Sequence, residues 1–181
     1  FSLIWWRNNR QDGSVSQIVK RNYLEIYSVS DLNESVPPSL NCSISLVDQS
    51  DHQLNKFFYK NVGKKFKWVD RLVWSDKQWI DYSSSQNVET YILKVEDNLA
   101  GYFELILHGN DQEIEIAYLG LLEEFYNKKL GSFLLSSAIK KSFEKKINRV
   151  WVHTCTLDHK NALNNYLSRG MKIFKKETVT I

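Results

Sequence analysis

The stretch 126–132 (YNKKLGS) has the composition of an anion-binding helix start. A strand-like run precedes it, and a helical pattern opens at Gly131-Ser132. The first N–H groups of a helix lack partners within the helix, and the helix dipole favours an anion there. Gly131 lets a phosphate approach the backbone, and Lys128 and Lys129 add positive charge. A lysine-flanked helix start is also typical of a solvated turn, so both interpretations stay open.

A second group of side chains that could do chemistry lies between residues 150 and 171. Tyr166 shares a helix face with Ala162 at i and i+4, as a proton-donating phenol or an amphipathic core tyrosine. His153 and Cys155 share a strand face, and His159 follows. A fourth ligand and the usual zinc spacings are missing, so we expect no metal site. Cys155 lies in an apolar strand, where thiols are usually inert.

Composition points to one folded domain. The 181 residues are 43% hydrophobic and 25% charged, with a net charge of +3. No apolar run reaches the length of a membrane span, and the basic excess is too small for a dedicated nucleic-acid binder. Only two cysteines occur, which favours a reducing cytoplasm. The apolar start lacks a basic region and is no signal peptide, and a first residue other than Met suggests an excised segment.

The elements that must position these side chains follow from hydrophobic period. Residues 1–39 are expected to be an arm packed on one domain at 40–181, with a strand near 21–28. A strand at 40–47 precedes a helix from Asp51 to Gly63 and a short helix capped by Ser75. Three strands at 89–96, 99–108 and 112–119 form a predicted antiparallel meander.

The remaining third predicts a long helix, a buried strand and a short helix. The helix spans 130–147, the strand 149–156 is apolar on both faces, and Asp158 is expected to cap a helix that Gly170 closes. Residues 171–181 form a final strand or pair of strands. The order β-β-β-α-β-α-β indicates an α+β fold in which a mixed, mostly antiparallel sheet packs against helices.

Together, the segments 126–132 and 150–171 resemble the GNAT superfamily of acyl-CoA-dependent N-acyltransferases. The resemblance extends over about residues 40–181. The family's cofactor pattern Q/R-x-x-G-x-G/A falls on residues 126–131, where Gly131 matches. The later pattern N-x-x-A-x-x-x-Y falls on residues 159–166, where Ala162 and Tyr166 match, followed by Gly170 and Met171. The stretch 153–159 (HTCTLDH) is similar to a bacterial subgroup of the family.

Three positions depart from the family patterns. Tyr126 stands in place of Gln or Arg, and Lys129 in place of the middle glycine, so its side chain either crowds or pairs with a pyrophosphate. His159 replaces the asparagine of the later pattern. The resemblance implies that the CoA-binding residues are Leu119, Leu121, Tyr126, Asn127, Lys128, Lys129, Leu130, Gly131, Ser132 and His159.

The resemblance also implies a sheet that splays after the third meander strand, where Gly120 permits a bulge that opens it just past Leu119. The pantetheine arm then pairs with the backbone of Leu119 and Leu121, and the Leu119 N–H holds the oxyanion. Glu115 aligns with the family's base, with Glu104 as a competing carboxylate. Tyr166 protonates the departing thiolate, and no metal is required.

The implied function is transfer of an acetyl group from acetyl-CoA to a primary amine of a small molecule or peptide. Trp68, Asp70 and Trp74 are expected to line the acceptor pocket, or else to form a structural cluster with an Asp70–Arg71 surface network. The alternative is a non-catalytic acyl-CoA-binding regulatory module with a degenerate pyrophosphate loop. We expect a cytoplasmic monomer or homodimer with neither nucleic acid nor membrane as partner.

Overall fold

A seven-stranded sheet runs through the computed structural model, which describes residues 16–49 and 51–180. The helices and strands occur in the order β1 (Ile18–Ile26), β2 (Cys42–Leu46), α1 (His52–Gly63), α2 (Asp76–Ser83), β3 (Val88–Val95), β4 (Asn98–His108), β5 (Glu113–Leu121), α3 (Leu130–Phe143), β6 (Arg149–Cys155), α4 (Ala162–Ser168) and β7 (Lys172–Thr180). The mixed α+β class predicted from the sequence is confirmed.

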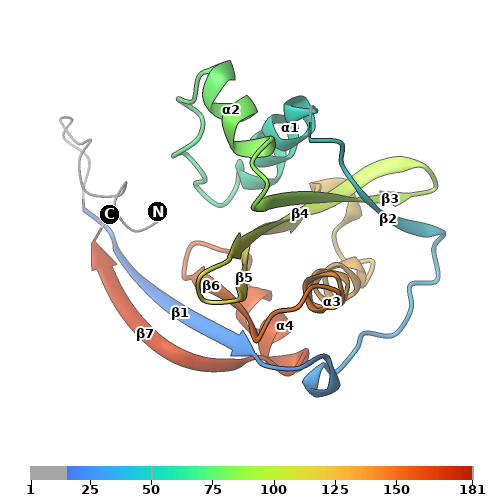
Figure 1. Ribbon diagram of the computed structural model, residues 1–181, viewed down its shortest axis with the longest axis vertical. Helices are drawn as coiled ribbons and strands as arrows, with labels where there is room; N and C mark the ends of the chain where they lie inside the picture. The colour runs from blue at the N-terminus through green and yellow to red at the C-terminus, as the bar shows by residue number, and fades with distance from the viewer. Residues whose placement is uncertain (1–15, 50, 181) are drawn as a thin grey trace.

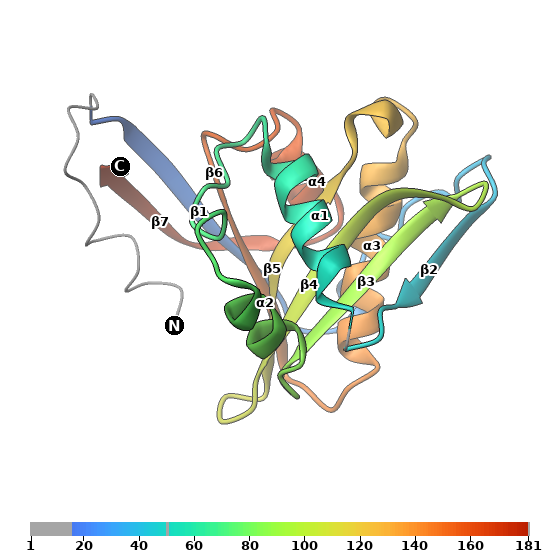
Figure 2. The same ribbon diagram turned by 90° about the horizontal axis from the view of Figure 1, so that it is seen from above.

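The strand order is β2-β3-β4-β5-β6-β1-β7, and each neighbouring pair is antiparallel except β5 and β6. Helices α1 and α2 lie on one side of the sheet, and α3 and α4 on the other (Figures 1 and 2). The chain thus forms three layers, with the sheet in the middle. This arrangement gives β3, β4 and β5 apolar neighbours on both faces.

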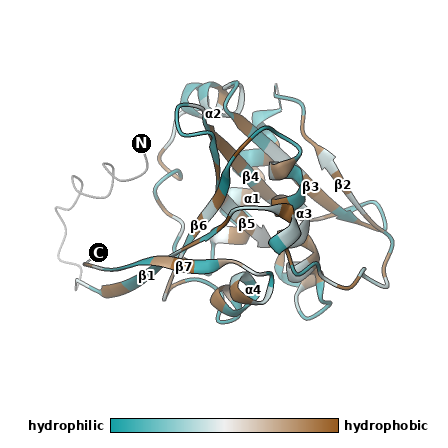
Figure 3. Ribbon diagram, turned by 60° about the horizontal axis from the view of Figure 1, so that its bottom comes forward, coloured by the Kyte–Doolittle hydropathy of each residue, from teal (hydrophilic) through white to brown (hydrophobic). Residues whose placement is uncertain are grey.

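The core follows from that layering. Strands β3 and β4 carry apolar colours along much of their length (Figure 3), and Leu93, Phe103 and Leu105 are buried there. Leu134 and Ala138 of α3 pack into the same cluster with no exposed surface. Full burial of each large side chain contributes about 1.5–3 kcal/mol, so this cluster fixes α3 against the sheet.

Strand β1 lies inside the sheet. It pairs antiparallel with β6 on one side, with Arg21 opposite Cys155, and with β7 on the other. Residues 18–26 of the predicted arm are therefore an interior strand, while residues 1–15 lie outside the described residues. The division into an arm at 1–39 and a domain at 40–181 stays a prediction.

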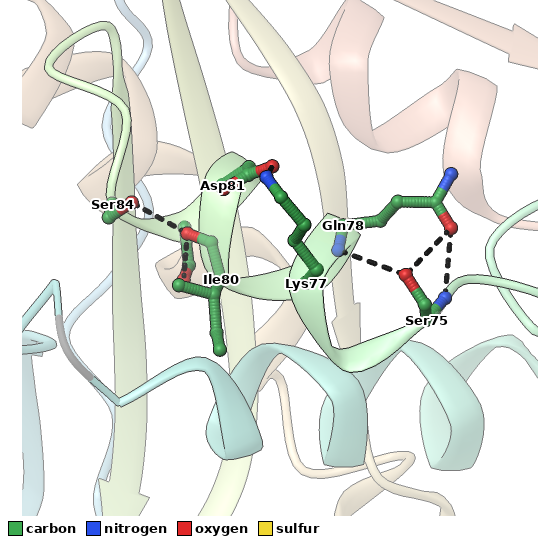
Figure 4. Close-up of polar contacts among 7 residues, drawn as sticks. Ser75, Lys77, Gln78, Ile80, Asp81 and Ser84 are labelled. Atoms are coloured by element: carbon green, nitrogen blue, oxygen red, sulfur yellow. Dashed lines mark hydrogen bonds and ion pairs between the residues drawn. The ribbon is translucent and has the colours of Figure 1, made fainter.

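Among the described α-helices, α2 is the one whose N-cap side chain makes a capping hydrogen bond; Asp51 before α1 and Lys129 before α3 make none. Ser75 caps α2 as predicted: its Oγ accepts from the Gln78 N–H, and the Gln78 side chain accepts from the Ser75 N–H (Figure 4). The prediction that Asp158 caps α4 is wrong. The helix begins after Asn161, and the Asp158 carboxylate instead accepts from Thr154 Oγ1 at 2.7 Å and the Cys155 N–H at 2.8 Å. Gly170 follows α4 with φ +98°, as a residue past the end of a helix commonly does.

Candidate functional site

A wedge opens between β5 and β6. The two strands pair only from Glu113 opposite Arg149 to Glu115 opposite Trp151. Beyond Glu115 they separate, and a cleft of about 1010 Å³ lies between them, lined by 116–121 on one side and by residues of β6 and α4 on the other. The predicted opening is thus present, but it starts at Glu115 and not past Leu119.

The bulge that opens the sheet lies at Ala117 and not at Gly120. Glu104 of β4 stands opposite Tyr118 and Leu105 opposite Ile116, so Ala117 is the extra residue. Gly120 has a different role, since a Cβ there would lie 2.4 Å from Val62 Cγ1. The glycine therefore lets α1 approach β5. The sequence analysis wrongly assigned Gly120 to the bulge.

Backbone groups of β5 face the wedge. The Leu122 N–H donates to the Ala100 carbonyl at 2.8 Å, and direction alternates along an antiparallel ladder. Residues 118, 120 and 122 therefore direct their N–H and C=O groups toward β4. Leu119 and Leu121 direct theirs to the opposite edge, where β6 has already diverged. Two strand residues thus have amides available to an extended ligand.

The N-terminus of α3 closes one end of the cleft with open amides. Its N-cap is Lys129, whose side chain makes no capping hydrogen bond. Lys129 has φ 59°, so it adopts the left-handed conformation that glycine favours, and the backbone keeps the geometry despite the substitution. A Cβ on Gly131 would meet only Asn165 Nδ2, at 3.9 Å, which leaves open space above the first turn. The site therefore suits a phosphate.

Aromatic rings join the two sides of the cleft beside this helix start. The His159 ring lies 5.4 Å from that of Tyr126 and 6.1 Å from that of Phe66, both in edge-on geometry. All three line the cleft. Tyr126 therefore contributes packing to the loop where the family pattern has Gln or Arg.

Tyr166 reaches the wedge from α4. The side chain is 8% exposed and lines the cleft, and its hydroxyl makes no hydrogen bond to any described residue. Burial and the charge of Asp158 raise the pKa of the phenol, so it stays protonated at neutral pH. A neutral phenol whose hydroxyl has no fixed partner can donate to a group in the cleft.

Glu115 has a partner that sequence analysis missed. The carboxylate is 4% exposed, lines the cleft, and lies 3.0 Å from His108 Nε2. His108 also stacks on Trp151, with ring centroids 5.9 Å apart. The hydrogen bond to Glu115 is the main cause that raises the pKa of His108. The predicted hairpin was the available signal, because its register puts His108 opposite Glu113, and Glu115 follows two residues later on the same face of the strand.

Glu104, the competing carboxylate, is engaged elsewhere. It is fully buried and accepts from Arg71 Nη1 at 2.9 Å, Tyr82 Oη at 2.7 Å and Asn55 Nδ2 at 2.9 Å. With these donors the carboxylate is fully partnered inside the protein. The expected Asp70–Arg71 surface network is wrong for Arg71, because its ion pair with Glu104 is buried.

The predicted acceptor residues gather on the side of the cleft next to α1 and α2. Trp68, Asp70 and Trp74 all line the cleft. The Trp68 ring packs edge-on against Tyr118 at 4.8 Å. The carboxyl group of Asp70 is half-buried, which raises its pKa. This side of the cleft is therefore aromatic, and its Asp70 carboxylate makes no hydrogen bond or ion pair with another described residue.

The cleft brings together nearly the whole predicted set. Lining residues include Glu115, Leu119, Leu121, Tyr126, Asn127, Lys129, Leu130, Gly131, Ser132, His159 and Tyr166, with the three acceptor residues. Lys128 is exposed and does not line it. Sequence analysis missed Arg71 and His108 as parts of this site.

Two other side chains of the cleft, His153 and Cys155, have pKa values shifted in favour of their neutral forms. Burial lowers the pKa of His153 and raises that of the Cys155 thiol. Across 16–49 and 51–180, no three His, Cys, Asp or Glu side chains are grouped as metal ligands. No helix in those ranges combines the length and apolar character needed to cross a bilayer.

Known proteins share this architecture. A GCN5-related N-acetyltransferase from Kribbella flavida superposes with a TM-score of 0.65 at 14% identity, covering 91% of this chain and 58% of that one. An aminoglycoside acetyltransferase from an uncultured soil metagenomic sample, solved with trehalose, gives 0.59 at 14%, covering 71% and 86%. At these identities the likeness is one of fold.

A curated mouse protein, a disintegrin and metalloproteinase with thrombospondin motifs 12, is 40% identical over 60 residues, which are 33% of this chain and 4% of that protein. The chain thus spans a small fraction of that relative's length. The sequence profile of the acetyltransferase (GNAT) family, by contrast, matches residues 49–171, from before α1 to the start of β7. This match covers the wedge, the α3 start and Tyr166, and the chain belongs to the GNAT acetyltransferase family.

Proposed function

We propose that the protein transfers an acetyl group from acetyl-CoA to a primary amine by direct attack. The main support is the wedge after Glu115. There the backbone N–H groups of Leu119 and Leu121, which point away from β4, face the same cleft as the start of α3, whose N-cap side chain makes no capping hydrogen bond. An extended pantetheine arm fits the free strand edge, and a pyrophosphate fits the helix start. These features support acetyl-CoA as the acyl donor.

The residues for the reaction lie along that cleft. The Leu119 N–H polarises the thioester carbonyl and stabilises the oxyanion that forms when the amine nitrogen bonds to the carbonyl carbon. Glu115 removes the proton from the attacking amine, and His108 passes it toward solvent. The carbon–sulfur bond then breaks, and Tyr166 donates its proton to the departing thiolate. Burial raises the pKa of the phenol, so Tyr166 is protonated at neutral pH and can hydrogen-bond to the sulfur and then give it the proton as negative charge develops there.

Supporting residues fix this arrangement. Asn165 Nδ2 donates to the Gly131 carbonyl at 3.1 Å and thereby links α4 to the helix start. Lys129, Tyr126 and His159 are assigned to the pyrophosphate and adenosine side, with Asn127, Leu130 and Ser132 as backbone donors. Trp68, Asp70 and Trp74 are assigned to the acceptor. We place the reaction in a bacterial cytoplasm, with the chain as monomer or homodimer.

The decisive experiment is a free-thiol release assay with acetyl-CoA over amines, amino acids, polyamines and peptides. Thiol release that depends on the amine, with a matching mass shift in the acceptor, supports the transferase. CoA binding by calorimetry without release across the panel would support the non-catalytic module instead. The absence of CoA binding would contradict both.

A further inference from the structure

Arg71 is a buried cation beside the acceptor side of the cleft. It is 7% exposed, and its guanidinium carbon lies 4.0 Å from the Tyr82 ring centroid and 4.3 Å from that of Tyr118. The Trp74 ring is 4.7 Å away. Burial alone would lower the pKa of Arg71, but Glu104 and the tyrosines outweigh it, and the group stays charged. Aromatic rings therefore hold the guanidinium in place without using its N–H donors.

Those donors exceed the acceptors that the protein supplies. A guanidinium carries five N–H groups. Among the described residues, the guanidinium donates one side-chain hydrogen bond, from Nη1 to Glu104 Oε2 at 2.9 Å. Arg71 also lines the cleft, so N–H groups without protein partners remain at the cleft surface. Charged N–H donors that face a cleft are suited to binding an oxygen-bearing ligand.

Asp70, the preceding residue, offers the complementary charge. Its carboxylate lines the cleft and makes no hydrogen bond or ion pair with another described residue. Asp81, which also lines the cleft, differs because Lys77 Nζ lies 2.5 Å from its Oδ2. One free carboxylate and one under-used guanidinium thus stand side by side, and this pairing matches an ammonium next to a carboxylate.

The register of β5 connects this pair to Glu115. Tyr118 stands opposite Glu104 and Glu115 opposite Ile106, and Glu104 and Ile106 share a face of β4. The Ala117 bulge therefore places Tyr118 and Glu115 on the same face, although they are three positions apart. At about 3.3 Å per residue, Glu115 is about 10 Å along the strand from the ring that covers Arg71.

We propose that the acceptor is an amino acid with a primary amine on its side chain, whose carboxylate binds Arg71 and whose α-ammonium binds Asp70. The side chain then extends along β5, and its terminal amine reaches Glu115. The inference rests on the proposed acetyl transfer, because Glu115 is the base there. An acceptor without a carboxylate leaves the Arg71 donors unpaired and binds weakly.

The test compares three ligands of similar length on the full chain. L-Lysine carries both groups, cadaverine lacks the carboxylate, and 6-aminohexanoate lacks the α-ammonium. Binding is followed by tryptophan fluorescence, since Trp68 and Trp74 line the cleft. We expect lysine to bind at least about tenfold more tightly than either analogue, because each loses a charge-assisted contact. Thiol release with acetyl-CoA is measured in parallel.

Variants assign each contact. Asp70→Asn should reduce the preference for L-lysine over 6-aminohexanoate. Arg71→Lys should reduce the preference for L-lysine over cadaverine, because the ammonium of the new side chain cannot replace the planar guanidinium. The double variant Arg71→Met/Glu104→Gln removes both buried charges together, so neither is left unpaired. Equal binding of lysine and cadaverine, no binding of any of the three, or a lysine preference that survives both Arg71 variants would overturn the proposal.

The binding and thiol-release assays distinguish the proposed amino-acid site from the proposed acetyl transfer. Selective lysine binding without thiol release would retain the binding site and contradict the acetyl transfer. Equal turnover of lysine and cadaverine would retain acetyl transfer and contradict the site.

Discussion

A negative charge at Gly131 should remove CoA binding. The residue sits in the first turn of α3, where the N–H groups are uncapped. A Cβ at this position would lie 3.9 Å from Asn165 Nδ2, an ordinary van der Waals contact, so the position has room for the Cβ of Gly131→Glu. The new carboxylate then lies beside the position we assign to the pyrophosphate.

The magnitude follows from Coulomb's law. Two unit charges about 4 Å apart at an effective dielectric of about 20 repel by about 4 kcal/mol, or about 1,000-fold in dissociation constant. The cleft mouth is open to solvent, and screening that halves this energy still leaves about 30-fold. We therefore expect CoA affinity to fall by about 30- to 1,000-fold.

Calorimetric titration of CoA into each variant measures this loss. Gly131→Gln is the matched control, because it has the same size without the charge, and its affinity should stay within about tenfold of the wild type. Thermal melting should show both variants equally stable. If the Glu and Gln variants bind CoA alike, the phosphate does not lie at the α3 start and the cofactor assignment is refuted.

Three further predictions test other parts of the site. Tyr166→Phe should lower turnover about a hundredfold with unchanged CoA affinity and melting temperature, because the hydroxyl bonds to no residue within 16–49 or 51–180; unchanged turnover would exclude the acid role. His108 has a raised pKa, so it becomes neutral and able to accept a proton only above pH 6.5; kcat/KM should rise with pH through that region, and His108→Gln should shift this limb, whereas coincident profiles would remove His108 from the proton path from Glu115. Gly120→Ala should destabilise the fold by about 1–3 kcal/mol in denaturant titrations, and a Val62→Ala background should recover most of it; a failure to recover would place the strain elsewhere.

The cap of α2 was predicted correctly because its signal acts over a few residues. The Ser75 cap and the helix that follows it depend on the spacing of Ser75 and Gln78 alone. The Asp158 cap failed because another local use of the same side chain, the bonds to Thr154 and Cys155, won over the helix start. At Lys129 the backbone adopts the left-handed conformation that glycine favours, although the residue is a lysine.

Long-range pairing set the limit of sequence analysis. The pairs Arg71–Glu104 and His108–Glu115 depend on how α1, α2 and the hairpin pack, and no spacing in the chain encodes the first of them. The bulge was assigned to Gly120 from residue type, yet Ala117 carries it, because cross-strand register and the approach of α1 decide the position. The side chains of the cleft were therefore largely predictable, and the partners that tune them were not.

The interior position of β1 has a consequence for how the protein is made. Strand β6 supplies part of the cleft wall, and on the side away from β5 it is held by β1, which lies far earlier in the sequence, with Arg21 opposite Cys155 and Ile26 opposite Val150. Contacts between such distant parts of a sequence form slowly, because a long loop must close first. The β3–β5 meander can assemble from neighbouring hairpins, whereas the wall that carries His153 and Cys155 needs the long-range pairing of β6 with β1. Completion of the candidate cleft is therefore expected to wait for the meeting of two strands that are far apart in the sequence.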